Sequence, residues 1–145
     1  MNIYGFNKEN RWLSNFAKLD YPIFYKGLQC NTTEEWYVLH KCKNFDDAKY
    51  IAEFQSPAKA KELGKLVELS DDFESNRIAI MKNAISQKFN MPSFYDKLIQ
   101  TEGYIEETNT WHDNFFGNCI CEKCQNIEGE NILGKLIMEF RASNR

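Results

Sequence analysis

The sequence predicts a mainly helical α+β fold with a few short strands, in a single domain that covers residues 1–145. Two observations lead to this class. Helical spacing of apolar residues, with capping residues at the starts, dominates the chain from residue 32 to residue 101. Short runs of β-branched and aromatic residues precede this part, and no internal repeat or linker divides the chain. A chain of 145 residues is long enough to bury a sizeable core.

The expected strands are short and lie near the two ends of the chain. Residues 2–6 and 21–25 are rich in aromatic and β-branched residues and are bounded by Gly, Asn and Asp, which is typical of strands. Residues 11–17 between them predict a polar turn with aromatic flanks. A weak alternation predicts a third short strand over 104–108.

Helices are expected over most of the middle of the chain. They run from Thr32 or Thr33 through Lys41, from Asp46 to Phe54, from Ser56 to about Leu63, from Ser70 or Asp71 to about Phe89, and from Pro92 onward. Gly64 follows the third of these as a natural C′ residue. A last helix begins at Asn131, which can cap it.

The buried faces of these helices follow from helical spacing. The apolar positions expected to face the core are Ile78, Met81, Ile85 and Phe89 in the longest helix, Tyr95, Leu98 and Ile99 in the next, and Ile132, Leu133, Leu136, Ile137 and Phe140 in the last. Between these last two helices, residues 109–128 predict a long irregular stretch. Such a stretch in a compact domain is usually functional or held by a metal.

Composition excludes several classes of protein. The net charge of −3 argues against a broad basic surface for duplex nucleic acid. No apolar run approaches the roughly 20 residues of a membrane span, and the first residues show no signal-peptide pattern. A cytoplasmic protein without membrane contact is therefore expected. Five cysteines, an odd number, in a reducing compartment argue against a disulfide framework.

Three of the cysteines form a C-x-C-x-x-C cluster of Cys119, Cys121 and Cys124. Thiolates are preferred ligands of structural zinc, which takes four ligands in a tetrahedron. The fourth ligand would come from Cys30, Cys42, His40 or His112. Two interpretations remain open, a structural zinc site and three free thiols on a surface loop.

The segment from Asn31 to Lys41 is the most informative one for function. Acidic residues at a helix start are stabilised by the free N–H groups there, and Glu34 and Lys41 share a helical face because they are seven positions apart. With Trp36 and Tyr37 beside them, this face could handle a flat polar ligand. The alternative is an ordinary capped helix whose aromatic residues are core.

The ordered set of short motifs along the chain resembles the NADAR superfamily, whose YbiA-like members are N-glycosidases. The matching residues are Leu13-Ser14-Asn15-Phe16, Thr32-Thr33-Glu34 with Lys41, Ser56-Pro57 with Ala60 and Gly64, Met81 with Lys88-Phe89, Thr101, Ile105-Glu106, Asp113 with Gly117, Gly129, Asn131, Leu133-Gly134, Met138 and Arg141. The resemblance spans nearly the whole chain. It implies a mainly helical α+β domain that acts on a ribose C1′–nitrogen bond.

The chain also departs from the family pattern. The family has a glutamate–histidine pair where this chain has Glu34-Glu35, and tryptophans where it has Phe73 and Phe116. These phenylalanines keep the aromatic surface but remove hydrogen-bond donors, which bears on the substrate. The segment between Thr101 and Glu106 is shortened.

The resemblance implies roles for particular residues. Glu34 is the first candidate for the carboxylate near C1′, and Asp113 is the second, as a general base or a ligand of the sugar hydroxyls. Lys41 could reach back to Glu34, pair with a ligand phosphate or attack C1′ as an amine. The substrate-binding candidates are Ser14 and Asn15 for polar contacts, Trp12, Trp36 and Phe116 for stacking, and Gly117 and Asn131 in the remaining motifs.

The implied substrate is ADP-ribose attached through an N-glycosidic bond, for example to guanine, free or in single-stranded nucleic acid. Three alternatives remain open: a ribosylamino-pyrimidine phosphate of riboflavin synthesis as substrate, a non-catalytic ADP-ribose-binding module, and an adaptor that binds a protein through its aromatic surface and cysteine loop. Catalysis requires no cofactor in this interpretation. The sequence does not specify an oligomeric state.

Overall fold

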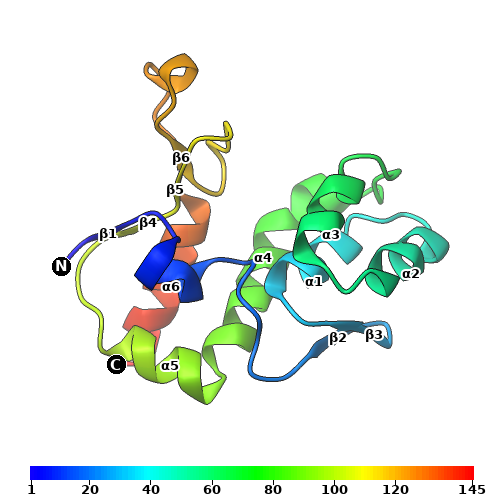
Figure 1. Cartoon of the computed structure of the whole chain (residues 1–145), viewed down its shortest axis with the longest axis horizontal. Coiled ribbons are helices and arrows are strands. Elements are labelled where there is room, and N and C mark those ends of the chain that lie inside the picture. Colours follow the sequence, from blue (N-terminus) through cyan, green and yellow to red (C-terminus); the bar gives the residue numbers. More distant parts are fainter. The chain divides into compact units, whose positions relative to one another are not determined.

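The computed structural model describes residues 1–145, which form two compact units (Figure 1). Unit 1 consists of residues 1–14 and 92–145, and unit 2 consists of residues 15–91. Helices dominate and the strands are short and paired, so the predicted α+β class is confirmed. The assignment of residues 1–145 to a single domain stays a prediction.

Unit 2 contains a hairpin and four α-helices. Its elements are β2 (Ile23–Tyr25), β3 (Leu28–Cys30), α1 (Thr33–Leu39), α2 (Phe45–Glu53), α3 (Pro57–Gly64) and α4 (Phe73–Phe89). β2 and β3 pair in antiparallel fashion. Lys26 and Gly27 connect them with φ angles of 47° and 82°, the positive values that a two-residue hairpin turn requires at both positions. The sequence analysis missed β3, which is only three residues long.

Helix α1 is surrounded by the other elements of unit 2. Its Val38 is fully buried, and a Cβ atom at Gly64 would meet Val38 Cγ1 at 2.8 Å. Gly64 therefore serves the close packing of α3 on α1. The prediction that it is a C′ residue is wrong, since it is the last residue of α3 itself. The helix also ends two residues before Lys41, whereas the sequence predicted that it continued through that residue.

The long helix α4 buries most of the face that spacing predicts. Met81, Ile85 and Phe89 are buried as expected, but Ile78 is 43% exposed. Ile78 lies two helical turns before Ile85, on the same face of the helix. Periodicity gives the direction of a side chain, but it does not tell how far the neighbouring elements extend along the helix.

Unit 1 combines short strands with helices from both ends of the chain. Its elements are β1 (Ile3–Tyr4), the 3-10 helix η1 (Lys8–Leu13), α5 (Pro92–Ile99), β4 (Ile105–Glu106), β5 (Thr108–Asn109), β6 (Asn118–Cys119), the 3-10 helix η2 (Glu122–Cys124) and α6 (Ile132–Ser143). β1 pairs with β4, and β5 with β6, both in parallel. The turn predicted over 11–17 begins in fact within η1. The stretch over 109–128, predicted to be irregular, contains β6 and η2.

The helices of unit 1 bury narrower faces than predicted. In α5, Phe94 and Leu98 are buried, one turn apart, whereas Tyr95 and Ile99 are half-buried. In α6 the expected core residues Leu133, Leu136 and Ile137 are buried, while Ile132 and Phe140 are half-buried.

Gly134 explains how α6 approaches strand β4. A Cβ atom at this position would lie 2.3 Å from the carbonyl oxygen of Ile105. Only glycine allows the helix backbone to come this close to the strand. None of the helices in either unit combines the length and the hydropathy needed to cross a bilayer.

Candidate active site and candidate metal centre

The first turn of α1 separates the two adjacent glutamates into different environments. Thr32 caps the helix: its Oγ1 accepts a hydrogen bond from the Glu35 backbone N–H at 3.2 Å and donates one to Glu35 Oε1 at 2.9 Å. This is a capping box, and it leaves Glu35 only 3% exposed. Glu34 is partly exposed. Of the two carboxylates, Glu34 is therefore the one that a ligand could reach.

Asn15 is held directly against this turn. The Glu34 backbone N–H donates to the Asn15 carbonyl oxygen at 3.0 Å, and Thr33 Oγ1 donates to Asn15 Oδ1 at 2.8 Å. Asn15 Nδ2 lies 3.6 Å from the sulfur of Met81 on α4. Two motifs that are 18 residues apart in sequence thus meet in the structure at Glu34. Ser14 immediately precedes Asn15 and is half-buried.

Burial of Glu35 disfavours its charged form, which the sequence did not predict. Its Oε2 has no hydrogen-bond partner. Burial raises the pKa of Glu35 above 4.5, and hydrogen bonds from Thr32 and from the backbone of Asn31 and Thr32 offset only part of this effect. A carboxyl with a raised pKa stabilises the folded state most at low pH, and this contribution is lost as the pH rises through the folded-state pKa.

We therefore expect Glu35→Gln to stabilise the protein at neutral pH. Glutamine keeps the capping box and removes the buried charge. Burial disfavours the charged carboxylate, so the free energy of unfolding of the uncharged variant is expected to be higher at pH 7. Denaturant unfolding of both proteins from pH 4 upward measures it. The gain should shrink toward pH 4, and a gain that is constant with pH would contradict this explanation.

Lys41 lies beyond the end of α1, beside an aromatic pair. Its Nζ is 5.8 Å from the Tyr37 ring centroid and 5.9 Å from that of Phe73, and these rings meet edge to face with centroids 5.6 Å apart. Ammonium groups at this distance interact favourably with ring faces. The lysine therefore has two aromatic neighbours, Tyr37 and Phe73.

The two predicted tryptophan contacts differ in their surroundings. Trp36 is 7% exposed, its Nε1 donates to the Phe24 carbonyl oxygen at 3.1 Å, and its ring lies 4.1 Å from that of His40. These contacts give Trp36 a packing role, and its substrate contact stays a prediction. Trp12 in unit 1 is half-buried, with Lys97 Nζ 5.9 Å from its ring.

In unit 1, Asp113 organises a tight turn. Its Oδ1 accepts hydrogen bonds from the backbone N–H groups of Phe115 at 3.0 Å and Phe116 at 2.9 Å. The side chain of Asn109 brackets the same residue, because its Oδ1 accepts from the Asp113 N–H and its Nδ2 donates to the Asp113 carbonyl oxygen. One carboxylate oxygen is thus fixed by the backbone. The other, Oδ2, lies outside these bonds.

The turn after Asp113 caps the last helix. Backbone N–H groups of Glu130, Asn131, Ile132 and Leu133 donate to the carbonyl oxygens of residues 114, 117, 115 and 116, at 2.9–3.1 Å. Those of Asn131, Ile132 and Leu133 are among the N–H groups that a helix start leaves unpaired. The start of α6 is therefore capped by protein carbonyls and is not a ready phosphate site.

Gly117 and Phe116 follow Asp113 in this turn. A Cβ atom at Gly117 would lie within 2.7 Å of side-chain atoms of Glu107 and Asn109, so glycine is required for packing. The ring of Phe116 is half-buried and lies 4.8 Å from that of Phe115. Stacking of a substrate on Phe116 therefore stays a prediction. Close packing explains why position 117 is glycine.

Asn131 is 1% exposed and links α6 to strand β4. Its Nδ2 donates to the Ile105 carbonyl oxygen at 2.9 Å, and its Oδ1 accepts from the Glu107 N–H at 3.0 Å. Asn131 is the residue before α6, as predicted, but its side chain forms no cap. These bonds give Asn131 a structural role, and its substrate contact stays a prediction.

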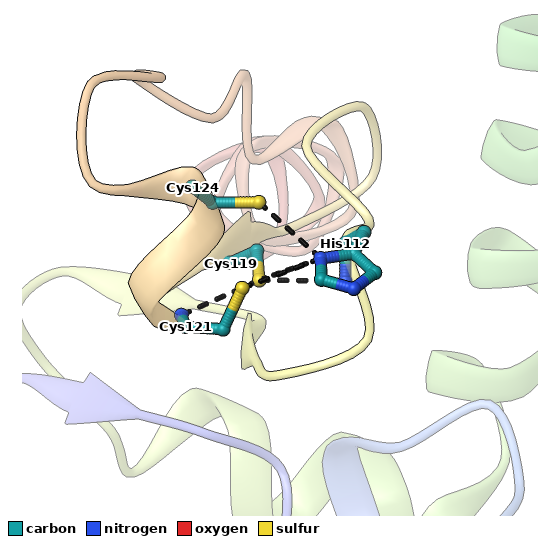
Figure 2. A group of neighbouring side chains, drawn as sticks. All are labelled: His112, Cys119, Cys121 and Cys124. Carbon is teal, nitrogen blue, oxygen red and sulfur yellow. Dashed lines mark hydrogen bonds between the residues drawn. The ribbon is translucent and has the colours of Figure 1, made fainter.

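The cysteine loop forms a compact cluster with one histidine. His112, Cys119, Cys121 and Cys124 bring their ligand atoms within 4.8 Å of one another, and the three sulfurs surround the imidazole Nδ1 (Figure 2). His112 Nδ1 lies 3.9, 3.3 and 3.4 Å from the sulfurs of Cys119, Cys121 and Cys124. In a tetrahedral zinc site the bond lengths place nitrogen and sulfur ligands about 3.5 Å apart. The cluster could hold one metal ion.

The surroundings of the cluster suit thiolate ligands. Backbone N–H groups of His112 and Cys121 point at Cys119 Sγ, at 3.3 and 3.5 Å, and Asn114 Nδ2 donates to Cys124 Sγ at 3.4 Å. Burial raises the pKa of Cys119, but the hydrogen bonds that it accepts lower it to about 7 overall. Hydrogen bonds of this kind orient ligands and tune a metal site.

The other predicted candidates for the fourth ligand lie in unit 2 and serve its packing. Burial raises the pKa of Cys30 to about 12 and that of Cys42 to about 11, which is typical of unreactive core thiols. His40 packs between the rings of Tyr25 and Trp36, with centroid distances of 4.3 and 4.1 Å. His112 is therefore the residue that completes the cluster.

Sequence reasoning gave no role to Lys88, which is fully buried in α4. Burial lowers its pKa to about 7. A buried lysine with such a shift is a candidate for a functional group, though structural positions also shift lysines. The signal was present in the sequence, because Lys88 follows Ile85 by three positions on the predicted buried face.

Together these features define a mainly helical α+β protein with a carboxylate presented at a helix start of unit 2 and a Cys/His cluster in unit 1. The sequence matches the NADAR domain over residues 4–145, and the chain belongs to the NADAR family. This family is associated with N-glycosidase activity. The predicted resemblance is thereby confirmed.

A solved structure supports the same fold. The NMR structure of the E. coli protein YbiA matches with a TM-score of 0.80 and 24% sequence identity, over 99% of this chain and 83% of that one. At this identity the match establishes the fold alone. The sequence has no match among curated proteins.

Proposed function

We propose that the protein is an N-glycosidase that hydrolyses the ribose C1′–N bond of an ADP-ribose-type substrate, with guanine as the leaving base. Membership of the NADAR family supports the reaction type. For this chain, the observation that supports the proposal is the position and exposure of Glu34. It is the partly exposed carboxylate of a rigid helix start, and Asn15 and Thr33 fix its backbone.

The chemistry follows from the charge that develops at the sugar. As the C1′–N bond breaks, its electron pair leaves with the base and C1′ becomes positive. Glu34 stabilises this charge, and its fixed position means that little reorganisation is needed at the moment of reaction. Water then adds to C1′ and loses a proton to a general base, a role that the sequence analysis gave to Asp113 as one of two alternatives. The departing base takes up a proton, so the products are free base and ADP-ribose.

The remaining candidates bind the substrate. The Lys41 ammonium pairs with a phosphate group. Its contacts with the Tyr37 and Phe73 rings orient the ammonium, and these rings carry no charge that would neutralise it. Asn15 and Ser14 supply polar contacts beside Glu34. Trp12 and Phe116 are the stacking candidates that are not deeply buried.

Purified protein incubated with ADP-ribosylated guanosine, with the same adduct in single-stranded DNA, and with ribosylamino-pyrimidine phosphates tests the proposal. Release of ADP-ribose from the first two substrates alone is expected, leaving unmodified guanosine in the first case and unmodified guanine in the DNA strand in the second. Release only from the pyrimidine substrates would overturn the ADP-ribose assignment. Tight binding of ADP-ribose without any release would instead identify a binding module.

We also propose that the ion held by the Cys/His cluster is zinc in a structural role. Three thiolates and one imidazole fill the four positions of a tetrahedral ion, so none is left for water or substrate, as in structural zinc sites. Elemental analysis of protein purified without chelator tests this. One zinc per chain is expected, and three freely titratable thiols without metal would overturn it.

A further inference from the structure

The turn that carries Asp113 is connected to the Cys/His cluster at two points. The first is covalent, since the metal-ligand candidate His112 directly precedes Asp113. His112 has a φ of 69°, in the left-handed region, and a non-glycine residue adopts this conformation only when its surroundings hold it there. The Nδ1 of its ring faces the three sulfurs, as Figure 2 shows.

The second connection is Asn114, which bonds to both the cluster and helix α6. Its Nδ2 donates to Cys124 Sγ at 3.4 Å, and its Oδ1 accepts from the Cys119 N–H at 2.9 Å. Its carbonyl oxygen accepts from the Glu130 N–H at 2.9 Å, at the start of α6. One residue thus ties two metal-ligand candidates to the helix that the turn caps.

We propose that metal binding at the Cys/His cluster fastens the Asp113–Gly117 turn and thereby makes the position of the Asp113 carboxylate dependent on the metal. In this account Asn114 is a positioning residue that acts through the turn. The part of the proposal that concerns turnover rests on the proposed function. The part that concerns the metal and the turn does not.

The chain around the cluster explains why a metal is needed there. The segment from residue 109 to residue 128 contains only two-residue strands and a single 3-10 turn. Ile120 and Ile127 in it are 63% and 51% exposed, so apolar packing contributes little to its order. A metal bound by four ligands from this segment supplies the missing constraint.

Cobalt(II) is a suitable probe because it reports its ligands by absorption. Protein stripped by chelator and dialysed free of it is titrated with cobalt(II). We expect one equivalent to produce the visible bands of a tetrahedral ion together with thiolate charge-transfer absorption, and zinc to displace it. Absence of these bands would overturn the proposal, whatever the enzyme does.

Hydrogen exchange then tests the fastening. The reporters are the N–H groups of Phe115 and Phe116, which bond to Asp113 Oδ1, and those of residues 130–133. Zinc should slow their exchange at least tenfold relative to the stripped protein, while amides of α4 in unit 2 serve as an internal control. Equal exchange with and without zinc would contradict the fastening.

Replacing Asn114 separates positioning from simple folding. Asn114→Ala keeps all four ligands and removes both side-chain bonds to the cluster. Loss of such outer contacts typically costs about 10–100-fold in metal affinity, and we expect a loss in this range. Asn144→Ala, an exposed asparagine of the same unit, is the matched control and should bind metal normally. Unchanged affinity in Asn114→Ala would contradict its role.

Turnover distinguishes this inference from the proposed function. If both hold, removing zinc lowers turnover and restoring zinc recovers it. Full turnover by the stripped protein, with its turn released, would overturn the dependence of Asp113 on the metal. If zinc orders the turn but no form of the protein cleaves the substrate, the proposed function fails and the fastening stands.

Discussion

Glu34→Gln is expected to reduce turnover at least about 100-fold while leaving the fold intact, because a positioned charge-stabilising group typically contributes this much. Glutamine matches the size of glutamate and removes its charge. The bonds that fix this position are made by the backbone of Glu34 and by Thr33 and Asn15, so they remain. Single-turnover kinetics with saturating substrate, together with thermal unfolding, measure the effect.

The neighbouring residue provides the matched control for this substitution. Glu35→Gln makes the same chemical change one position later, at a buried carboxylate. It should keep near-normal turnover while changing stability in the pH-dependent way described above. Equal losses in both variants, or near-normal turnover by folded Glu34→Gln, would remove Glu34 from the mechanism.

Asp113→Asn is the second substitution with a large expected effect. The asparagine Oδ1 can still accept the N–H groups of Phe115 and Phe116, so the turn should persist. A general base typically contributes about 10²–10⁴-fold, and its loss acts on the transition state more than on the bound substrate. We expect kcat to fall in this range with little change in Kd for ADP-ribose.

Binding and turnover together decide the role of Asp113. If Kd rises strongly and the turnover of bound substrate is unchanged, the carboxylate holds the sugar hydroxyls instead of activating water. Metal content must be measured in the same samples, because His112 adjoins this position. A variant that has lost its metal would report on the cluster and not on the carboxylate.

Local signals in the sequence predicted the helices and the start of α1 well. The sequence left Thr32 and Thr33 as alternative caps, and the structure shows that Thr32 caps α1 by accepting the N–H three residues ahead. The difference between Glu34 and Glu35 could not be predicted, since both fit the first turn of a helix. Burial of one of them depends on the capping box and on neighbouring elements, which a local pattern does not contain.

In the loop of residues 109–128, the sequence predicted only part of the candidate metal site. The three cysteines were identified by their spacing, but His112, seven or more positions before them, was one of four candidates for the fourth ligand. The carbonyl groups that cap α6 belong to residues 114–117, and a pattern of side chains does not predict such backbone contacts.

The most direct test of the central claim is the product analysis of one reaction. Wild-type protein and Glu34→Gln are incubated side by side with ADP-ribosylated guanosine, and the released guanosine and ADP-ribose are quantified by mass spectrometry. The account predicts that wild type releases both products in equal amounts and that Glu34→Gln releases about 100-fold less. Cleavage at the pyrophosphate without release of base, or equal release by both proteins, would contradict it.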